Sequence, residues 1–304
     1  MINFIIIFSF LSLGIIAKRF ITEQQAATDH LNKLVINIII PAVILLNAPD
    51  LLADKSLLPL IYSPWVILLF SALMILSLAK VFAWNRSTTA ALLLMGTLGN
   101  TSFLGFPMIE ALLNRDALQY AVVYDQIGNF LALAIFGTSI IAIYGEGKSS
   151  PNIKDIGLRI IRFPPFIFLV LTISLKAMAL DPKDFSLLAE VVTPITYLLT
   201  PVTMFIIGLN FSINIAEHQK SAFICGLVIK LIAAPFMMYL WARNLTENTL
   251  MLQTLTLEAG MPPMVTAAAL AMSANLERKL CASMVAIGLL TALVSLPIIY
   301  LIIR

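Results

Sequence analysis

Charged side chains are scarce in this chain of 304 residues. Asp, Glu, Lys and Arg make up 12% of the sequence, whereas hydrophobic residues make up 60% and the mean hydropathy is +0.98. A soluble domain carries roughly twice that charge. A nucleic-acid surface is excluded as well, because the net charge is only +3 and no long run of like charge occurs. The chain is therefore expected to fold in a lipid bilayer, without a sizeable soluble domain.

Cysteine and histidine are also scarce, with two of each. Cys225 and Cys281 lie in apolar surroundings, where free cysteines behave as small hydrophobic residues. Two such cysteines supply no disulfide framework and no paired-thiol metal motif. Gly-x-Ser-x-Gly, Gly-rich phosphate loops and His-Glu-x-x-His are absent from the sequence. The sequence therefore predicts neither an enzyme nor a cofactor or metal site.

What the chain has in abundance is long apolar stretches, each too long for a barrel strand and without the two-residue alternation of one. Helices are then the only way to satisfy their backbone groups in lipid. The first stretch has no basic residue before it, so it is expected to remain as a span rather than to act as a cleaved signal peptide. The stretches cover residues 1–17, 31–49, 61–84, 88–113, 117–144, 164–180, 187–214, 221–242, 248–275 and 281–303. The predicted fold class is an all-α polytopic membrane protein with ten transmembrane helices.

Basic residues beside the spans indicate the orientation. With the N-terminus outside, twelve Lys and Arg residues lie on the inner side and six on the outer side, as the positive-inside rule requires. The inner ones are Lys18, Arg19, Lys33, Lys80, Arg86, Lys148, Lys154, Arg159, Arg162, Lys220, Arg278 and Lys279. The outer ones are Lys55, Arg115, Lys176, Lys183, Arg243 and Arg304. We expect a multi-pass protein of the plasma (bacterial inner) membrane with both termini outside.

The most polar segment, from Gly145 to Arg162, divides the chain almost in half and has the Gly, Ser and Pro content of a linker. Five spans precede it and five follow, so the second half must insert upside down, as an inverted repeat. Prolines agree with this, because Pro41 and Pro201 each lie in the second span of a half. The predicted units are an N-terminal repeat (1–144), a cytoplasmic linker (145–163) and a C-terminal inverted repeat (164–304).

The fourth and ninth spans are expected to be broken. The fourth contains three glycines, Asn100, Thr101 and Ser102 before Pro107, and the ninth contains Pro262–Pro263. Proline disfavours helix in its predecessor, so each span should unwind and restart as a half-helix. Paired breaks in inverted halves point to a binding site, and half-helix N-termini suit a carboxylate. The alternative is a pair of kinked helices whose small residues serve packing.

Two charges and a polar cluster also lie at membrane depth. Glu258 precedes the second break by one turn, and a carboxylate there should be protonated, paired or bound to a cation such as Na⁺. Lys230 is the other deep charge, so an ion pair between Lys230 and Glu258 is the structural alternative to ion coupling. Asp125, Gln126 and Asn129 fall within about one helical turn. They either contribute to coupling or hold helices together.

The order of several motifs along the chain resembles the auxin efflux carrier family in its short bacterial form. The motifs are the Asn37-Ile-Ile-Ile-Pro41 run, GNTSFLGFP at 99–107, YDQIGNF at 124–130, TPVTMFIIGLN at 200–210 and EAGMPPM at 258–264. No single motif decides the match, but their order runs along the whole chain. The linker is short, and the Asn-Pro-Asn-Thr motif of the plant carriers is missing from the fifth span, so auxin itself is not the expected substrate.

The resemblance implies a fold similar to that of the bile acid sodium symporters, in which the fourth and ninth spans cross at their breaks. It implies a scaffold of spans 1, 2, 6 and 7 that also forms a homodimer, and a mobile domain of spans 3–5 and 8–10. Small organic acids such as malonate, meeting Asn100, Pro107, Pro262 and Pro263, would be the substrates. Glu258 looks like the ninth-span carboxylate that binds a cation in the symporters.

The predicted function is secondary transport of a small organic anion by alternating access, coupled to H⁺ or Na⁺. The first rival on the same architecture is a sodium-coupled, bile-acid-like symporter or a proton antiporter. A rival of another class is a membrane receptor that keeps the fold without transport.

Overall fold

The computed structural model describes residues 2–48, 55–145, 153–211 and 219–304. Within these ranges the regular secondary structure is all helical, and the one strand-like pairing is an isolated antiparallel bridge between Gly99 and Pro263. The all-α class expected from the sequence is confirmed. Helices occupy all ten of the apolar stretches expected to span the membrane, and the inverted relation between the halves stays a prediction.

The first half contains α-helices joined by short π and 3₁₀ turns, which are labelled η. In chain order they are α1 (Ile2–Ala17), α2 (Gln24–Leu34), η1 (Val35–Ile39), α3 (Ile40–Asn47), η2 (Lys55–Leu57), α4 (Leu58–Val81), α5 (Arg86–Met95), η3 (Thr101–Gly105), α6 (Phe106–Leu112), η4 (Arg115–Ala117), α7 (Leu118–Val123), η5 (Tyr124–Phe130), η6 (Leu133–Gly137) and α8 (Thr138–Tyr144).

The second half is also built of α-helices and short η turns. Its elements are α9 (Ile153–Ile161), α10 (Pro164–Ala177), η7 (Pro182–Asp184), α11 (Ser186–Thr196), α12 (Leu199–Leu209), α13 (Lys220–Val228), η9 (Ile229–Ala233), α14 (Ala234–Ala242), α15 (Thr249–Ala259), α16 (Val265–Ser273) and α17 (Arg278–Ile303). Helix α9 occupies part of the segment expected to be a linker, because its apolar residues recur at helical spacing. Residues 146–152 of that linker lie outside the described residues.

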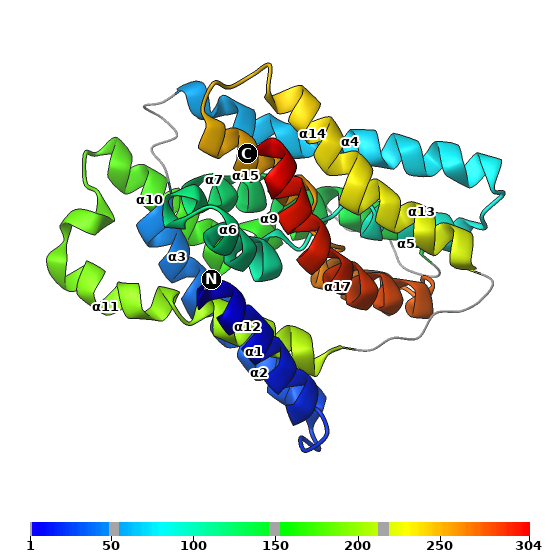
Figure 1. Ribbon diagram of the computed structural model, residues 1–304, viewed down its shortest axis with the longest axis horizontal. Coiled ribbons are helices and arrows are strands. Elements are labelled where there is room, and N and C mark those ends of the chain that lie inside the picture. Colours follow the sequence, from blue (N-terminus) through cyan, green and yellow to red (C-terminus); the bar gives the residue numbers. More distant parts are fainter. Residues whose placement is uncertain (1, 49–54, 146–152, 212–218) are drawn as a thin grey trace.

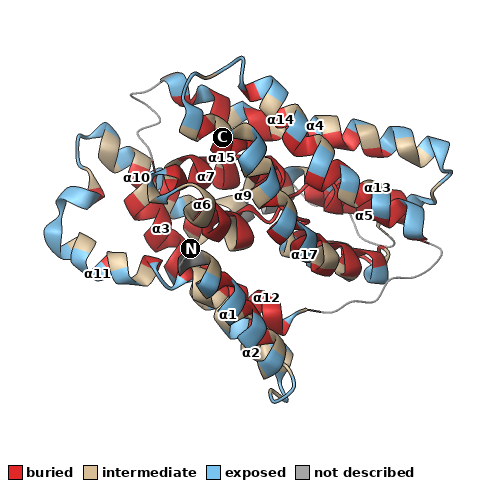
Figure 2. Ribbon diagram, in the orientation of Figure 1, coloured by how far each residue is buried: buried red, intermediate tan, exposed pale blue. Residues whose placement is uncertain are grey.

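Length and composition mark six helical segments of the described chain as able to cross a membrane. They are Gln24–Asn47, Leu58–Val81, Arg115–Tyr144, Ser186–Leu209, Lys220–Ala242 and Arg278–Ile303. Three further apolar helices are shorter: Phe4–Ala17, Thr101–Leu112 and Pro164–Ala177. Large apolar side chains face outward, as on α17, where Val294 is 63% and Leu301 68% exposed (Figure 2). An apolar outer surface of this kind suits lipid, and the chain is a polytopic membrane protein.

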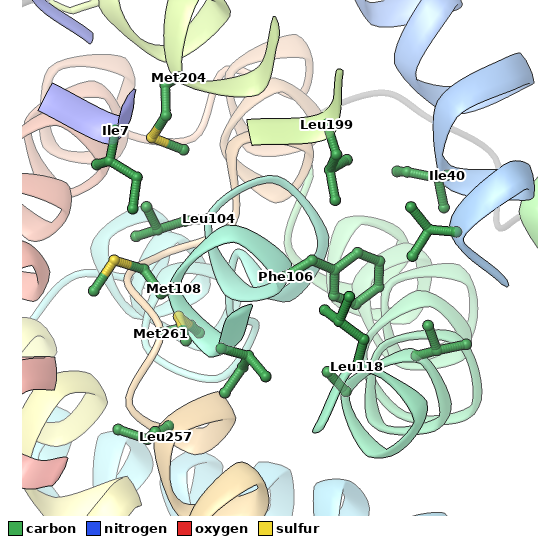
Figure 3. Packing of buried hydrophobic residues seen from close by; sticks show 14 of the residues in the cluster. Ile7, Ile40, Leu104, Phe106, Met108, Leu118, Leu199, Met204, Leu257 and Met261 are labelled. Carbon is green, nitrogen blue, oxygen red and sulfur yellow. The ribbon is translucent and has the colours of Figure 1, made fainter. Parts of the chain in front are cut away.

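The helices form two groups around a shared centre. Figure 1 shows α1, α2, α3, α10, α11 and α12 along the left and lower side, and α4, α5, α13, α14 and α17 along the right. Helices α6, α7 and α15 lie between the groups. The central core packs around η3 and α6. Leu104 and Met108 lie on the side of Met261 and Ile7, and Phe106 points the other way, toward Leu118 (Figure 3).

Helices α1 and α12 approach each other closely through two glycines. An ideal Cβ on Gly208 would lie 2.3 Å from the carbonyl oxygen of Leu11 and 2.9 Å from Cα of Gly14. An ideal Cβ on Gly14 would meet the carbonyl oxygen of Phe205 at 2.3 Å. Only residues without side chains permit such contact between membrane helices, so these two positions set the spacing of α1 and α12.

Three π turns end two residues before a proline. These turns are η1 before Pro41, η3 before Pro107 and η9 before Pro235. Proline has no N–H to donate, and its ring clashes with the carbonyl one turn earlier. A wider turn before the proline relieves that conflict without ending the helix. Two of the three turns, η3 and η9, carry the polar residues of the site described next, in line with the frequent occurrence of π turns at functional sites.

Candidate functional site

The two segments predicted as the fourth and ninth spans are interrupted in the structure, and their interruptions lie against each other. Helix α5 ends at Met95 and helix α15 ends at Ala259. A short non-helical segment follows each of them before helix resumes. Across the crossing the N–H of Asn100 donates to the carbonyl of Pro262 at 2.8 Å, and the N–H of Met264 donates to that of Leu98 at 3.0 Å. The unwound backbone therefore finds its partners in the other broken span.

The interruptions lie slightly earlier than the prolines alone indicate. In the fourth span the residues outside helix are 96–100, and helix resumes at η3, before Pro107. Pro107 lies at the start of α6, directly after the π turn η3, so the helix continues through it and the break does not fall at the proline. In the ninth span Pro262 and Pro263 lie within the extended segment before α16. The prediction of two paired breaks agrees with this geometry, and the position of the first is set by its glycines.

A buried carboxylate joins the fourth span to the fifth. Asp125 of η5 accepts hydrogen bonds from the hydroxyls of Thr101 (2.5 Å) and Ser102 (2.6 Å), and from Nε2 of Gln126 (2.6 Å). Asn129, also in η5, donates to Oγ1 of Thr101 at 3.1 Å. The sequence placed Asp125, Gln126 and Asn129 together, and the structure adds Thr101 and Ser102 as their partners. We call these five residues the Asp125 cluster.

Glu258, near the end of α15, is fully buried, and neither of its carboxylate oxygens has a hydrogen-bond partner. The carboxylate lies against the backbone of Gly105 in η3, where an ideal Cβ would be 2.7 Å from Oε2 and 2.9 Å from Oε1. Any side chain at position 105 would displace the carboxylate. The sequence identified Gly105 as one of the three glycines of the fourth span, but not as the neighbour of Glu258.

Lys230, in η9, is also buried, with 2% of its surface exposed. Its ammonium donates a hydrogen bond of 2.9 Å to the carbonyl oxygen of Ala259, the last residue of α15. Within the described chain the ion pairs closer than 4.0 Å join Arg115 to Glu110 and Lys176 to Asp181, and none joins Lys230 to Glu258. The two charges are therefore not in direct contact, although they interact electrostatically.

Three buried polar side chains at the crossing keep atoms without hydrogen-bond partners. They are Nδ2 of Asn100, Oε1 of Gln126 and both carboxylate oxygens of Glu258. Each residue is at most 4% exposed. Leaving a buried polar group unpaired costs about 1–3 kcal/mol. These atoms are therefore available to a ligand as one donor and several acceptors.

The remaining chemistry of the described residues is sparse. No group of three or more His, Cys, Asp or Glu side chains in the described ranges is arranged to hold a metal ion. Cys225 and Cys281 are free thiols, and Cys281 is buried. The polar atoms at the crossing therefore come from amides, hydroxyls, carboxylates, one ammonium and the main chain.

Comparisons with known proteins agree with this architecture. The family model described as Membrane transport protein matches residues 1–300. An uncharacterized transporter of Methanocaldococcus jannaschii is 25% identical over 276 residues, which cover 89% of this chain and 88% of the relative. An uncharacterized transporter of Methanothermobacter thermautotrophicus is 26% identical over 284 residues, or 91% of this chain and 88% of the relative. The match therefore extends over essentially the whole sequence.

Interrupted spans that cross through their main chains, a buried polar centre and a family match over 300 residues lead to one assignment. This chain belongs to the membrane transport protein family that includes the auxin efflux carriers.

Proposed function

We propose that this chain is a secondary active transporter of a small organic anion, a carboxylate of the auxin or malonate kind, that works by alternating access. The observation that carries the proposal is the crossing of two interrupted spans around buried polar atoms that have no partner. In transporters, unwound backbone at membrane depth is tolerated where it lines a substrate or ion site. Kinks that served packing alone would leave no reason for the unpaired donor of Asn100.

The substrate carboxylate binds at the crossing, beside Asn100, Pro107, Pro262 and Pro263. The helical segments that restart there, η3–α6 and α16, direct their free N–H groups and positive dipole ends toward it. Nδ2 of Asn100 supplies a further donor, since it has no partner among the described residues. Thr101 and Ser102 take part through the Asp125 cluster, which holds the fifth span against the restarted helix.

The architecture that fits this function is ten transmembrane helices in two inverted five-helix repeats, residues 1–144 and 164–304. Paired packing supports it: α1 in the first span lies against α12 in the seventh, and α10 in the sixth lies against α3 in the second. An inverted repeat requires such reciprocal contacts. The left-hand group of Figure 1 then forms the scaffold, which dimerises, and the right-hand group moves with the substrate.

Coupling takes place at Glu258 with H⁺ or Na⁺ as the coupling ion. Its bare carboxylate lies in the ninth span, one turn before the extended segment of the crossing, and faces the backbone of Gly105. Gain or loss of a cation there changes the charge next to the substrate anion, which links the two sites energetically.

Uptake into proteoliposomes tests the proposed function. Labelled malonate and other mono- and dicarboxylates should accumulate against a gradient when a pH or Na⁺ gradient is imposed. In parallel, these acids should raise the melting temperature of the purified protein, because a ligand that binds the folded state stabilises it. A receptor of the same fold would show the second effect without the first. Absence of both effects for every carboxylate would refute the proposal.

Replacing Asn100 by Ala is expected to weaken carboxylate binding by about 1–3 kcal/mol, the cost of a lost hydrogen bond to a charged group. The melting temperature without ligand should be unchanged or higher, since the unpaired donor is removed. Isothermal titration of the purified protein measures the affinity for the carboxylate, and a thermal melt measures the melting temperature. The matched control is Asn244→Ala, whose amide is exposed and bonds only the carbonyl of Leu240. A parallel loss of folding and binding in Asn100→Ala would favour a packing role.

The proposed orientation also has a direct test. In a variant without Cys225 and Cys281, a cysteine placed at Ser149 should react with an impermeant thiol reagent only from the inner side. A cysteine added after Arg304 should react only from the outer side, as the distribution of basic residues requires. Ser149 lies outside the described residues, so this test is independent of the structure. The opposite labelling pattern would reverse the orientation.

A further inference from the structure

Lys230 brings a positive charge to the crossing of the two broken spans. Its ammonium bonds the carbonyl of Ala259, at the C-terminal end of the half-helix α15. An ideal Cβ on Gly99 would lie 3.1 Å from Nζ and 3.3 Å from Cε of Lys230. Gly99 is also the residue that bridges to Pro263. The ammonium therefore enters between the two interrupted segments through the space left by a glycine.

The surroundings of this ammonium are those of a cation site. The last carbonyls of a helix carry partial negative charge and have no partner in their own helix. The residue before Ala259 is Glu258, whose carboxylate has no hydrogen-bond partner and interacts electrostatically with both Lys230 and Asp125. In transporters with broken helices, the ends of half-helices and unwound carbonyls coordinate Na⁺ or bind H⁺.

A free cation and the ammonium would compete for this place. The Lys230 ammonium has three N–H donors, and one of them already donates to the Ala259 carbonyl. A Na⁺ ion drawn to the same carbonyl and to Glu258 would lie next to a fixed like charge. In a buried environment that repulsion is large, because the effective dielectric constant is low.

We propose that the Lys230 ammonium is a built-in cation that occupies the place of a coupling Na⁺ at the crossing. The wild-type protein then has no Na⁺ site there, and removal of the ammonium creates one. For the coupling step this inference rests on the proposed function and assigns that step to H⁺. The cation site itself requires no transport, so it is tested on binding alone.

The experiment is a thermal melt of the purified protein in NaCl against choline chloride at equal ionic strength. Wild type and Lys230→Arg should melt at the same temperature in both salts. Lys230→Met should melt higher in NaCl, by about 2–4 °C once Na⁺ exceeds its dissociation constant tenfold. The double variant Lys230→Met with Glu258→Gln should lose that difference. Lys33→Met, which removes an exposed lysine of α2, is the control for a change in net charge.

Each arm can overturn the proposal. If the melting temperature of wild type rises in NaCl but not in choline chloride, that result overturns the proposal, whether or not any variant folds. Equal melting of Lys230→Met in both salts would also do so, and Lys230→Gln repeats this arm if the Met variant fails to fold. Failure of the proposed function is separate, because it appears as the absence of carboxylate binding in wild type. If wild type binds no carboxylate but Lys230→Met is stabilised by Na⁺, the proposed function fails and the proposed cation site is still supported.

Discussion

Glu258→Gln is expected to bind the substrate anion but to lose ion-driven accumulation. Glutamine keeps the shape of the protonated acid and cannot exchange a proton or pair with a cation. Uptake into proteoliposomes should no longer respond to an imposed gradient, because the amide has no proton to exchange and no charge to pair with a cation. Exchange of labelled for unlabelled substrate at zero gradient should continue. The two assays together separate coupling from binding.

The same variant also tests whether Glu258 forms an ion pair with Lys230. If the two residues formed an ion pair, Glu258→Gln would strand a buried ammonium and destabilise the protein in every buffer. Lys230 instead bonds the Ala259 carbonyl and is not in direct contact with Glu258, so the melting temperature should fall less than the loss of a direct ion pair would cause. Glu190→Gln, at an exposed position of α11, is the matched control. A large drop in melting temperature that Lys230→Met reverses, with normal gradient dependence, would contradict the coupling role.

The second large effect is expected at Gly208. Alanine there would place Cβ 2.3 Å from the carbonyl oxygen of Leu11, a main-chain atom that cannot move without separating α1 from α12. Overpacking of this kind costs about 1–3 kcal/mol or more. The melting temperature should therefore fall by several degrees, and Gly14→Ala should act in the same direction.

The control for this prediction is Gly157→Ala in α9, where an added Cβ would meet nothing within 4 Å. Alanine favours helix over glycine by about 1 kcal/mol, so this variant should melt at the same temperature or slightly higher. Equal melting of Gly208→Ala and wild type would show that α1 and α12 pack less closely than the structure has them.

Hydropathy and proline positions were enough to predict much of this fold. Each of the ten stretches proved helical, and the paired breaks were visible from Pro107 and Pro262–Pro263, because a missing N–H acts locally. The sequence did not reveal the π turns, since a wider turn uses the same apolar residues as a regular helix. It also did not reveal helix α9, which the polar composition around it obscured.

The partners of the site residues were harder to predict, since they lie on other spans. Asp125, Gln126 and Asn129 were recognised as a cluster, but nothing near them in the chain identifies Thr101 as the donor to Asp125. For Lys230 the choice between an ion pair with Glu258 and a carbonyl partner depends on distances of a few ångströms. Packing of separate helices sets such distances, and a single sequence carries little information about them.

The two hydrogen bonds of the crossing run from main chain to main chain, from Asn100 to Pro262 and from Met264 to Leu98. A joint made in this way places no demand on the chemistry of the side chains around it. Substitutions that adapt the pocket to a new acid can therefore accumulate during evolution while the joint keeps its shape. Under the proposed function, the range of acids carried could change through side-chain substitutions alone, while these two main-chain hydrogen bonds are kept.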